Sequence, residues 1–164
     1  MGDRANIVFG AVTSISLDGT DIGFTTGGVT YTKQKEHTDV ELDQVIGVGK
    51  KYKSMERLFV ETTLAEATLA NLQRAFDEPA GNMVQSGSQL DIGGNSATAS
   101  EHTMTLVGKG PNSGTRTFSL YIVVSVDETA YIAGSRTEAG TVPVRFECLK
   151  DPDQGYKFGA IVDS

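Results

Sequence analysis

Runs of alternating apolar and polar residues dominate the chain and predict β-strands. Residues 7–32 predict two or three strands in this way, with a hairpin turn at Asp18-Gly19. Residues 142–148 alternate between apolar and polar side chains, as expected of a strand with one buried face. Residues 118–126, FSLYIVVSV, are apolar on both faces, which is typical of a central strand. We therefore expect a mainly β protein.

One segment breaks the two-residue period and predicts an α-helix over about residues 63–77. Thr63 is a suitable N-cap, Glu66 completes a capping box, and Pro79 prevents the helix from continuing. The apolar side chains of this segment fall on one narrow stripe: Ala65, Leu69, Leu72 and Phe76. A helix with a single apolar stripe covers one patch of a sheet, so we expect one flanking helix.

Two further segments are expected to leave the compact body. Residues 33–57 are the most charged part of the chain and predict a long early loop or extended arm. Its first half is acidic and its second half is basic, and the charged residues that define this split are Asp39, Glu41, Asp43, Lys50, Lys51 and Lys53. Residues 80–100 are rich in small and polar residues, and we expect a flexible loop with one short strand around Leu90 and Ile92.

Composition narrows the classes of protein that the chain can represent. A length of 164 residues favours one domain over residues 1–164. The net charge of −7 argues against nucleic-acid binding, because the chain would repel DNA. The absence of a signal-peptide-like or membrane-spanning apolar run predicts a soluble, unprocessed protein made in the cytoplasm.

Few residues suggest catalysis. His37 and His102 have no spaced partner, and the single cysteine, Cys148, lies on the apolar face of a predicted strand, which favours an inert thiol. The segment 47–54, GVGKKYKS, fails the phosphate-loop pattern, and 151–155, DPDQG, is better explained as a turn than as a calcium loop. We expect no catalytic residue, no metal and no cofactor.

Three stretches in the first half of the chain carry a family resemblance. They are SISLDGTDIGFTTGGVTY, then VELDQVIG with its Asp43-Gln44 pair, then VETTLAEATLANLQRAF. In this order and spacing, over roughly residues 6–79, the chain resembles the tail tube (major tail) proteins of long-tailed bacteriophages. That family is related in fold to the tube proteins of contractile tails and of type VI secretion. The second half matches only in its general β-character.

The resemblance implies a fold, an assembly and a set of partners. The fold would be a β-sandwich or barrel-like domain flanked by one helix. Six copies would form a ring, and rings would stack into a hollow tube that conducts DNA without binding it specifically. Further partners would be tape-measure, tail terminator and baseplate or tip proteins, with no membrane contact. The protein would be assembled in the host cytoplasm and would reside in the virion tail.

Within this hypothesis, the charged residues of the arm are candidates for the contact between rings or for the lumen surface. The sequence does not separate these two roles for Asp39, Glu41 and Asp43. Three other classes stay open. A monomeric ligand-binding β-barrel requires an apolar cavity with aromatic lining, and an enzyme on a β-sandwich requires convergent acids or a nucleophile with its base. A different self-assembling tail, secretion-tube or capsid-accessory protein would share the assembly chemistry.

Overall fold

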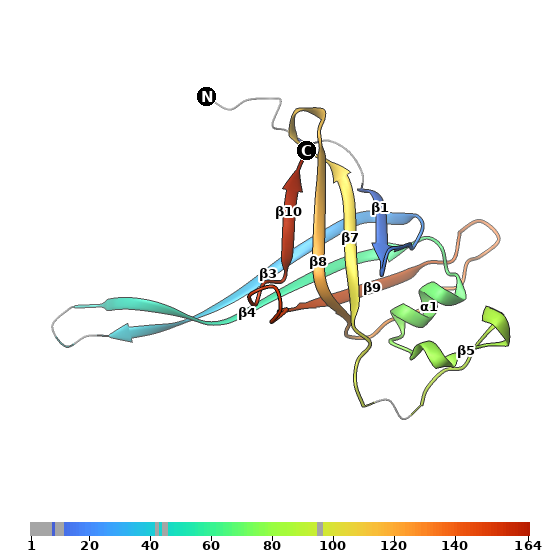
Figure 1. Ribbon diagram of the computed structural model, residues 1–164, viewed down its shortest axis with the longest axis horizontal. Coiled ribbons are helices and arrows are strands. Elements are labelled where there is room, and N and C mark those ends of the chain that lie inside the picture. Colours follow the sequence, from blue (N-terminus) through green and yellow to red (C-terminus); the bar gives the residue numbers. More distant parts are fainter. Residues whose placement is uncertain (1–7, 9–11, 42, 44–45, 95–96) are drawn as a thin grey trace.

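The computed structural model describes residues 8, 12–41, 43, 46–94 and 97–164 (Figure 1). Its strands are β1 (Val12–Leu17), β2 (Thr20–Asp21), β3 (Thr25–Glu41), β4 (Val48–Leu64), β5 (Met83–Val84), β6 (Gln89–Leu90), β7 (His102–Lys109), β8 (Thr115–Ser125), β9 (Val142–Leu149) and β10 (Gly159–Asp163). The helix α1 spans Leu69–Ala75, and short 3₁₀ segments cover Ala80–Asn82, Gln85–Gly87 and Pro111–Ser113. With 55% of residues in strands and 11% in helical segments, the fold is mainly β, as expected.

Eight of the strands form one antiparallel sheet in the order β2-β1-β7-β8-β9-β4-β3, with β10 added beside β8. The strand β8 connects two layers because its two halves have different partners along one edge. Residues 116–120 pair with β10, whereas residues 122–125 pair with β9. In Figure 1, β1, β7, β8 and β10 run together while β3, β4 and β9 cross them. The sheet therefore folds over itself into a sandwich-like body.

The hydrophobic core lies between these layers. Strand β9 shows why, since its residues alternate between buried and half-buried, as the pattern of residues 142–148 predicted. The core is one cluster to which β1, β4, β7, β8, β9 and the helix contribute: Ile15, Leu17, Ile22, Val60, Leu64, Ala75, Met104, Leu106, Leu120, Val123, Val142, Val144, Phe146 and Cys148. Residues 9–11, part of the first predicted strand, lie outside the described residues.

The predicted turn at Asp18-Gly19 is present between β1 and β2. Both residues have positive φ, 51° and 74°, as a two-residue hairpin turn of this twist requires. The Asp18 carboxylate accepts a hydrogen bond from the Thr103 amide at 2.8 Å, and its other oxygen lies 2.6 Å from His102 Nδ1. Burial alone would raise the pKa of Asp18, but these two contacts outweigh burial and lower it. His102 therefore helps to fix a turn.

The helix is shorter than predicted and begins later. It starts after Thr68, whose hydroxyl accepts a hydrogen bond from the Asn71 amide at 3.2 Å, so the N-cap predicted at Thr63 is wrong. Thr63 instead continues β4 and is paired with β3 and β9. Glu66 accepts a hydrogen bond from the Phe24 amide rather than closing a capping box. Sheet pairing on both sides of residues 62–64 overrides the local capping signal.

The buried face of the helix also differs from the predicted stripe. Asn71 and Ala75 are its buried residues, and Leu72 packs against the core from a partly buried position. The side-chain amide of Asn71 donates through Nδ2 to the carbonyl oxygens of Ile22 and Glu66, both at 2.8 Å. A polar side chain therefore ties the helix to the loops that flank β2 and β4.

Residues 80–100 contain more regular structure than one short strand. Strands β5 and β6 form a small two-stranded ladder in which Met83 pairs with Leu90. Ile92 lies beyond β6 and is exposed, so its predicted place in a strand is wrong. Residues 95–96 lie outside the described residues, and the mobility expected of the segment stays a prediction.

The Asn71 hydrogen bonds yield a stability prediction. Asn71→Ala should lower the free energy of unfolding by about 1–3 kcal/mol, because it removes the donor to the buried Ile22 carbonyl and to the partly buried Glu66 carbonyl. Urea unfolding followed by circular dichroism measures the change. Asn82→Ala is the matched control, since its amide bonds lie at a more exposed position and should contribute about 1 kcal/mol or less. Equal stability of Asn71→Ala and the parent chain would contradict the anchoring role.

Candidate functional site

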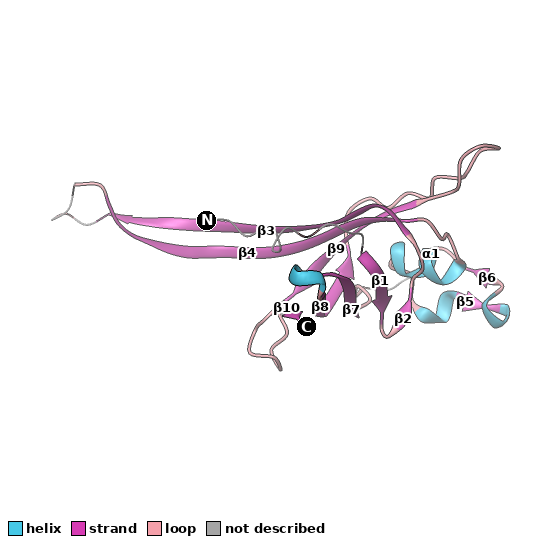
Figure 2. Ribbon diagram, turned by 90° about the horizontal axis from the view of Figure 1, so that it is seen from above, coloured by secondary structure: helices cyan, strands magenta, loops and turns pink. Residues whose placement is uncertain are grey.

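A long β-hairpin stands out from the body. β3 and β4 pair from Thr25 opposite Leu64 to Glu41 opposite Val48, but only residues 58–64 of β4 also pair with β9. The remainder projects as an arm, which we define as residues 33–57 (Figures 1 and 2). Almost all of its described residues are exposed. The charged segment of the sequence is therefore an extended hairpin.

The hairpin register brings the acidic and basic halves of the arm together. Asp39 lies opposite Lys51, and the Lys51 ammonium is 2.6 Å from the Asp39 carboxylate. Lys53 contacts Glu56 at 3.1 Å, and the Lys50 ammonium lies 4.8 Å from the centre of the Tyr52 ring. The three lysines singled out in the sequence thus have partners within the chain. As an exposed ion pair, Asp39–Lys51 contributes about 0–1 kcal/mol.

The two remaining acidic candidates lie nearer the far end of the arm. Glu41 is opposite Val48, Asp43 belongs to the turn, and both are exposed. Leu42, Gln44 and Val45 lie outside the described residues. The structure therefore brings Asp39 and Lys51 together but leaves Glu41 and Asp43 facing solvent.

A cluster of charges marks the root of the arm. The Glu56 carboxylate lies 2.6 Å from the Lys33 ammonium, 3.1 Å from that of Lys53 and 3.5 Å from that of Lys150. Hydrogen bonds from Lys33 and Lys53 lower the pKa of Glu56 to about 2. One carboxylate faces three ammonium groups, so the cluster carries excess positive charge on a chain whose net charge is −7.

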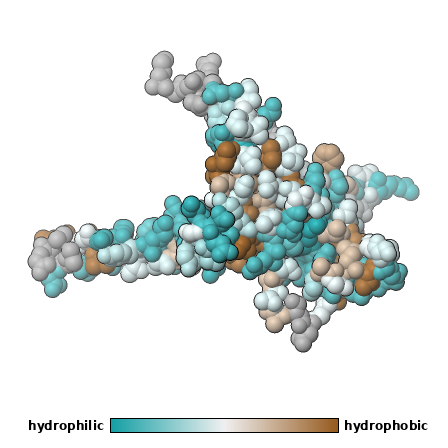
Figure 3. Space-filling view, viewed as in Figure 1, coloured by the Kyte–Doolittle hydropathy of each residue, from teal (hydrophilic) through white to brown (hydrophobic). Residues whose placement is uncertain are grey.

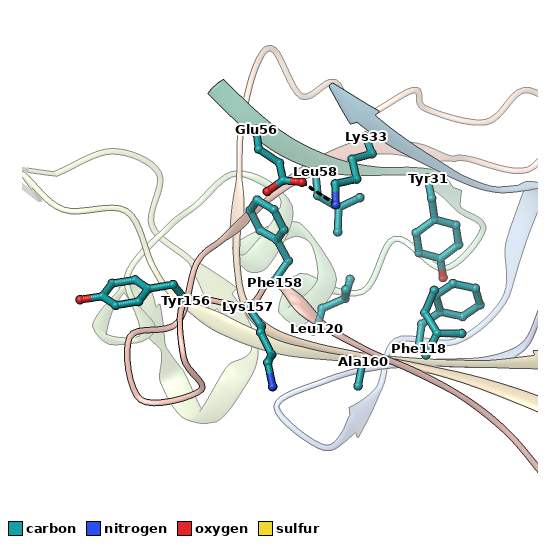
Figure 4. Close-up of a pocket in the computed structure, with 12 residues that line it drawn as sticks. Tyr31, Lys33, Glu56, Leu58, Phe118, Leu120, Tyr156, Lys157, Phe158 and Ala160 are labelled. Carbon is teal, nitrogen blue, oxygen red and sulfur yellow. Dashed lines mark ion pairs between the residues drawn. The ribbon is translucent and has the colours of Figure 1, made fainter. Parts of the chain in front are cut away.

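Beside this cluster the two layers of the sandwich separate and leave an apolar cleft of about 490 Å³ (Figure 4). β3 and β4 contribute Tyr31 and Leu58, which lie next to the arm, to one wall, and β8 contributes Phe118 to the other. The ring centres of Tyr31 and Phe118 lie 4.4 Å apart in a stacked arrangement. The remaining wall comes from the last part of the chain, mainly Phe158 and Ile161.

The cleft opens between two strands with free edges. β3 pairs only with β4, and β10 pairs only with β8, among the strands that the structure describes. The residues Ile161 and Val162 of β10 are exposed apolar side chains. An unpaired edge presents free N–H and C=O groups, and monomeric proteins normally block such edges. The open side of this sandwich therefore combines an apolar cleft with two surfaces suited to strand pairing.

Cys148 and His37, which the sequence analysis considered for catalysis, lie in the core and on the exposed arm. Cys148 is buried in the core, and burial together with the neighbouring Glu147 raises the pKa of its thiol to about 12. His37 is exposed on the arm opposite Lys53. In the described part of the chain, no group of three or more His, Cys, Asp or Glu side chains is placed to hold a metal ion.

Acidic side chains that border loops, at positions 77, 78 and 127, bind groups in or near those loops. Asp77 accepts a hydrogen bond from the Ser100 amide at 2.7 Å, and Glu78 accepts one from the Gly93 amide at 2.8 Å. Asp127 forms an ion pair with Arg145. Residues 151–155 form a turn.

Within the described ranges, no helix has the length and apolar character needed to cross a membrane.

Comparison with known proteins yields no match, either to a protein-family model or to a curated protein sequence. We therefore infer the function from the residues and their arrangement. The sequence identified the arm through its charge, but it gave no sign of the cleft. The cleft is built from residues near positions 31, 58, 118 and 160, which are far apart in the chain and carry no shared motif.

The Glu56 cluster predicts a pH dependence of stability. The pKa of Glu56 is about 2 in the folded chain, against 4.5 for an ordinary glutamate, so its contribution to stability is complete above pH 4.5 and is lost as the pH falls towards 2. Over this range the urea midpoint of the parent chain should fall more steeply than that of Glu56→Gln. Glu36→Gln, at an exposed position on the opposite face of the arm, should behave like the parent. Parallel curves for all three would contradict the assignment.

The Cys148 thiol should be unreactive in the folded protein. Its burial and raised pKa leave almost no thiolate at pH 8, and the thiolate is the reacting species. Ellman's reagent should give no stoichiometric reaction in buffer and complete reaction in guanidinium chloride. Rapid labelling of the native protein would restore Cys148 as a candidate nucleophile.

Proposed function

We propose that this chain is the repeating subunit of a phage-type tail tube, in which hexameric rings stack into a hollow tube that conducts DNA. The observation that carries the proposal is the arm, a paired hairpin that projects beyond the body with its outer edges free. A monomer gains no core from such an arm, and an exposed strand edge is a liability unless another chain covers it. The arm is therefore best explained as a contact between copies.

The open side of the sandwich supports the same assembly. β3 and β10 provide free edges at which neighbouring copies can extend one sheet into the next. Contacts between different surfaces of identical subunits generate closed rings when the rotation closes and open filaments when it does not. A stack of rings uses both kinds of contact, and this fold offers edges for one and an arm for the other.

The resemblance of residues 6–79 to tail tube proteins gives this assembly its specific form. The mainly β fold with one helix fits that family's architecture. Because the net charge is −7, passing DNA would be repelled rather than held. In this proposal the tube also meets tape-measure, terminator and baseplate or tip proteins, and it resides in the virion tail.

The cleft favours a second candidate function. It is apolar, it has a volume of about 490 Å³, and Tyr31, Phe118 and Phe158 line it. Small-molecule sites have this size and character, so a monomer that binds an apolar ligand is the main alternative. The cleft is open at the edge of the sandwich and lies beside the arm. A monomeric binding protein would not need such an arm.

Electron microscopy of the concentrated, purified protein tests the proposal. Negative staining should show rings or hollow tubes of uniform width, and light scattering should show masses well above 17.4 kDa. Shells or other shapes would instead favour a different assembly protein of tails or capsids. A strict monomer that binds one molecule of an apolar dye would favour the ligand-binding alternative.

Trimming the arm should abolish tube formation without unfolding the body. Replacing residues 37–54 with Asn-Gly retains the pair Glu36–Met55 and closes the hairpin with a two-residue turn. The body should keep its circular dichroism spectrum and its thermal unfolding midpoint within a few degrees, because almost all described residues of the removed range are exposed and none of them belongs to the core. Normal tubes from this variant would contradict the role given to the arm.

A further inference from the structure

The far end of the arm is apolar although the rest of the arm is charged. Ile46 is fully exposed in the turn region, and Val48 and Tyr52 are exposed on β4. Figure 3 shows hydrophilic residues along most of the arm and hydrophobic ones near its end. We call Val40, Ile46 and Val48 the arm tip. The exposure of Ile46 and Val48 leaves apolar surface in water at an unfavourable free energy, and none of the described residues covers these two side chains.

The cleft is the matching uncovered surface, but the arm tip cannot reach the cleft of its own chain. The ladder of β3 and β4 continues from Lys33 opposite Leu58, at the cleft, to Glu41 opposite Val48, near the tip. Eight residues of extended strand place the tip about 26 Å beyond the cleft wall. Both views show the hairpin leading away from the body (Figures 1 and 2). The arm tip can therefore meet such a cleft only on another copy of the chain.

Charge distinguishes the arm tip from a neutral apolar ligand as the occupant. The cleft borders the Glu56 cluster, in which one carboxylate faces the ammonium groups of Lys33, Lys53 and Lys150. Lys157 adds a further cation to the lining. The tip is flanked by Glu41 and Asp43, both exposed, and by one cation, Lys50, which lies opposite Val40. An apolar end with more acidic than basic neighbours thus matches an apolar cleft bordered by an excess of lysines.

We propose that the arm tip of one copy inserts into the cleft of a second copy. The contact is heterologous, because each copy offers one tip and one cleft, so a pair of copies retains a free tip and a free cleft and can add further copies. Ile46 enters the apolar cleft, and Glu41 and Asp43 meet the lysines at its border. This inference rests on the proposed function and specifies where on the neighbouring copy the arm binds.

Disulfide cross-linking between two single-site variants tests the contact. Ile46→Cys places a thiol at the arm tip, and Ile161→Cys places one on the exposed wall of the cleft. Cys148 can stay, because it is buried. The two variants carry tags of different size, are mixed under assembly conditions and are oxidised with copper phenanthroline. Phe24→Cys replaces Ile161→Cys in the control mixture, since Phe24 is exposed but does not line the cleft.

The mixture of Ile46→Cys and Ile161→Cys should yield roughly tenfold or more heterodimer than the Phe24→Cys control, because seating raises the effective thiol concentration. Tubes that form without this preference would overturn the tip-in-cleft contact and leave the tube proposal intact. Preferential cross-linking without tubes would support the contact and reject the tube. Stoichiometric dye binding to the clefts of assembled material would show clefts open to small apolar ligands, and would also overturn the inference.

Discussion

The fold depends on the way in which β8 divides its hydrogen bonds. One edge of β8 pairs with β7, and the other edge pairs first with β10 and then with β9. This change of partner turns one antiparallel sheet into two layers that enclose the core. It also determines what stays open, because the layers meet along β8 and separate between β3 and β10. The cleft and both free edges are consequences of a sandwich that closes on one side only.

The opened side explains how a small body can support a long arm. β4 serves the core with residues 58–64 and the arm with residues 48–57, so the arm is a continuation of a core strand. The half of β4 inside the body is paired on both sides, which gives the arm a rigid base. The charges of the arm then have two functions. Some, such as Asp39 and Lys51, hold its strands together, whereas Glu41 and Asp43 stay available to another molecule.

The sequence was sufficient for features with a local signal and failed where distant segments decide the outcome. The alternation of residues 142–148 and the turn at Asp18-Gly19 predicted a strand and a hairpin, because both patterns follow from the geometry of single elements. The helix start was placed five residues too early, because Thr63 and Glu66 satisfy a capping pattern while their neighbours satisfy a sheet. The cleft had no local signal, since its walls come from four distant segments.

The arm also contains irregularities that constrain how its length can change. Opposite the step from Glu36 to His37, β4 skips Ser54, so an extra residue bulges from the ladder. Because of this bulge, Lys53 and Glu56 share a face although they are three positions apart. Deleting Ser54 would remove the bulge and keep Lys51 opposite Asp39, whereas deleting a paired residue such as Tyr52 would turn every following side chain of β4 to the other face. During evolution, a single residue can therefore be lost readily at the bulge, whereas the paired parts of the arm can lengthen or shorten readily only by matched changes in both strands, in steps of two residues.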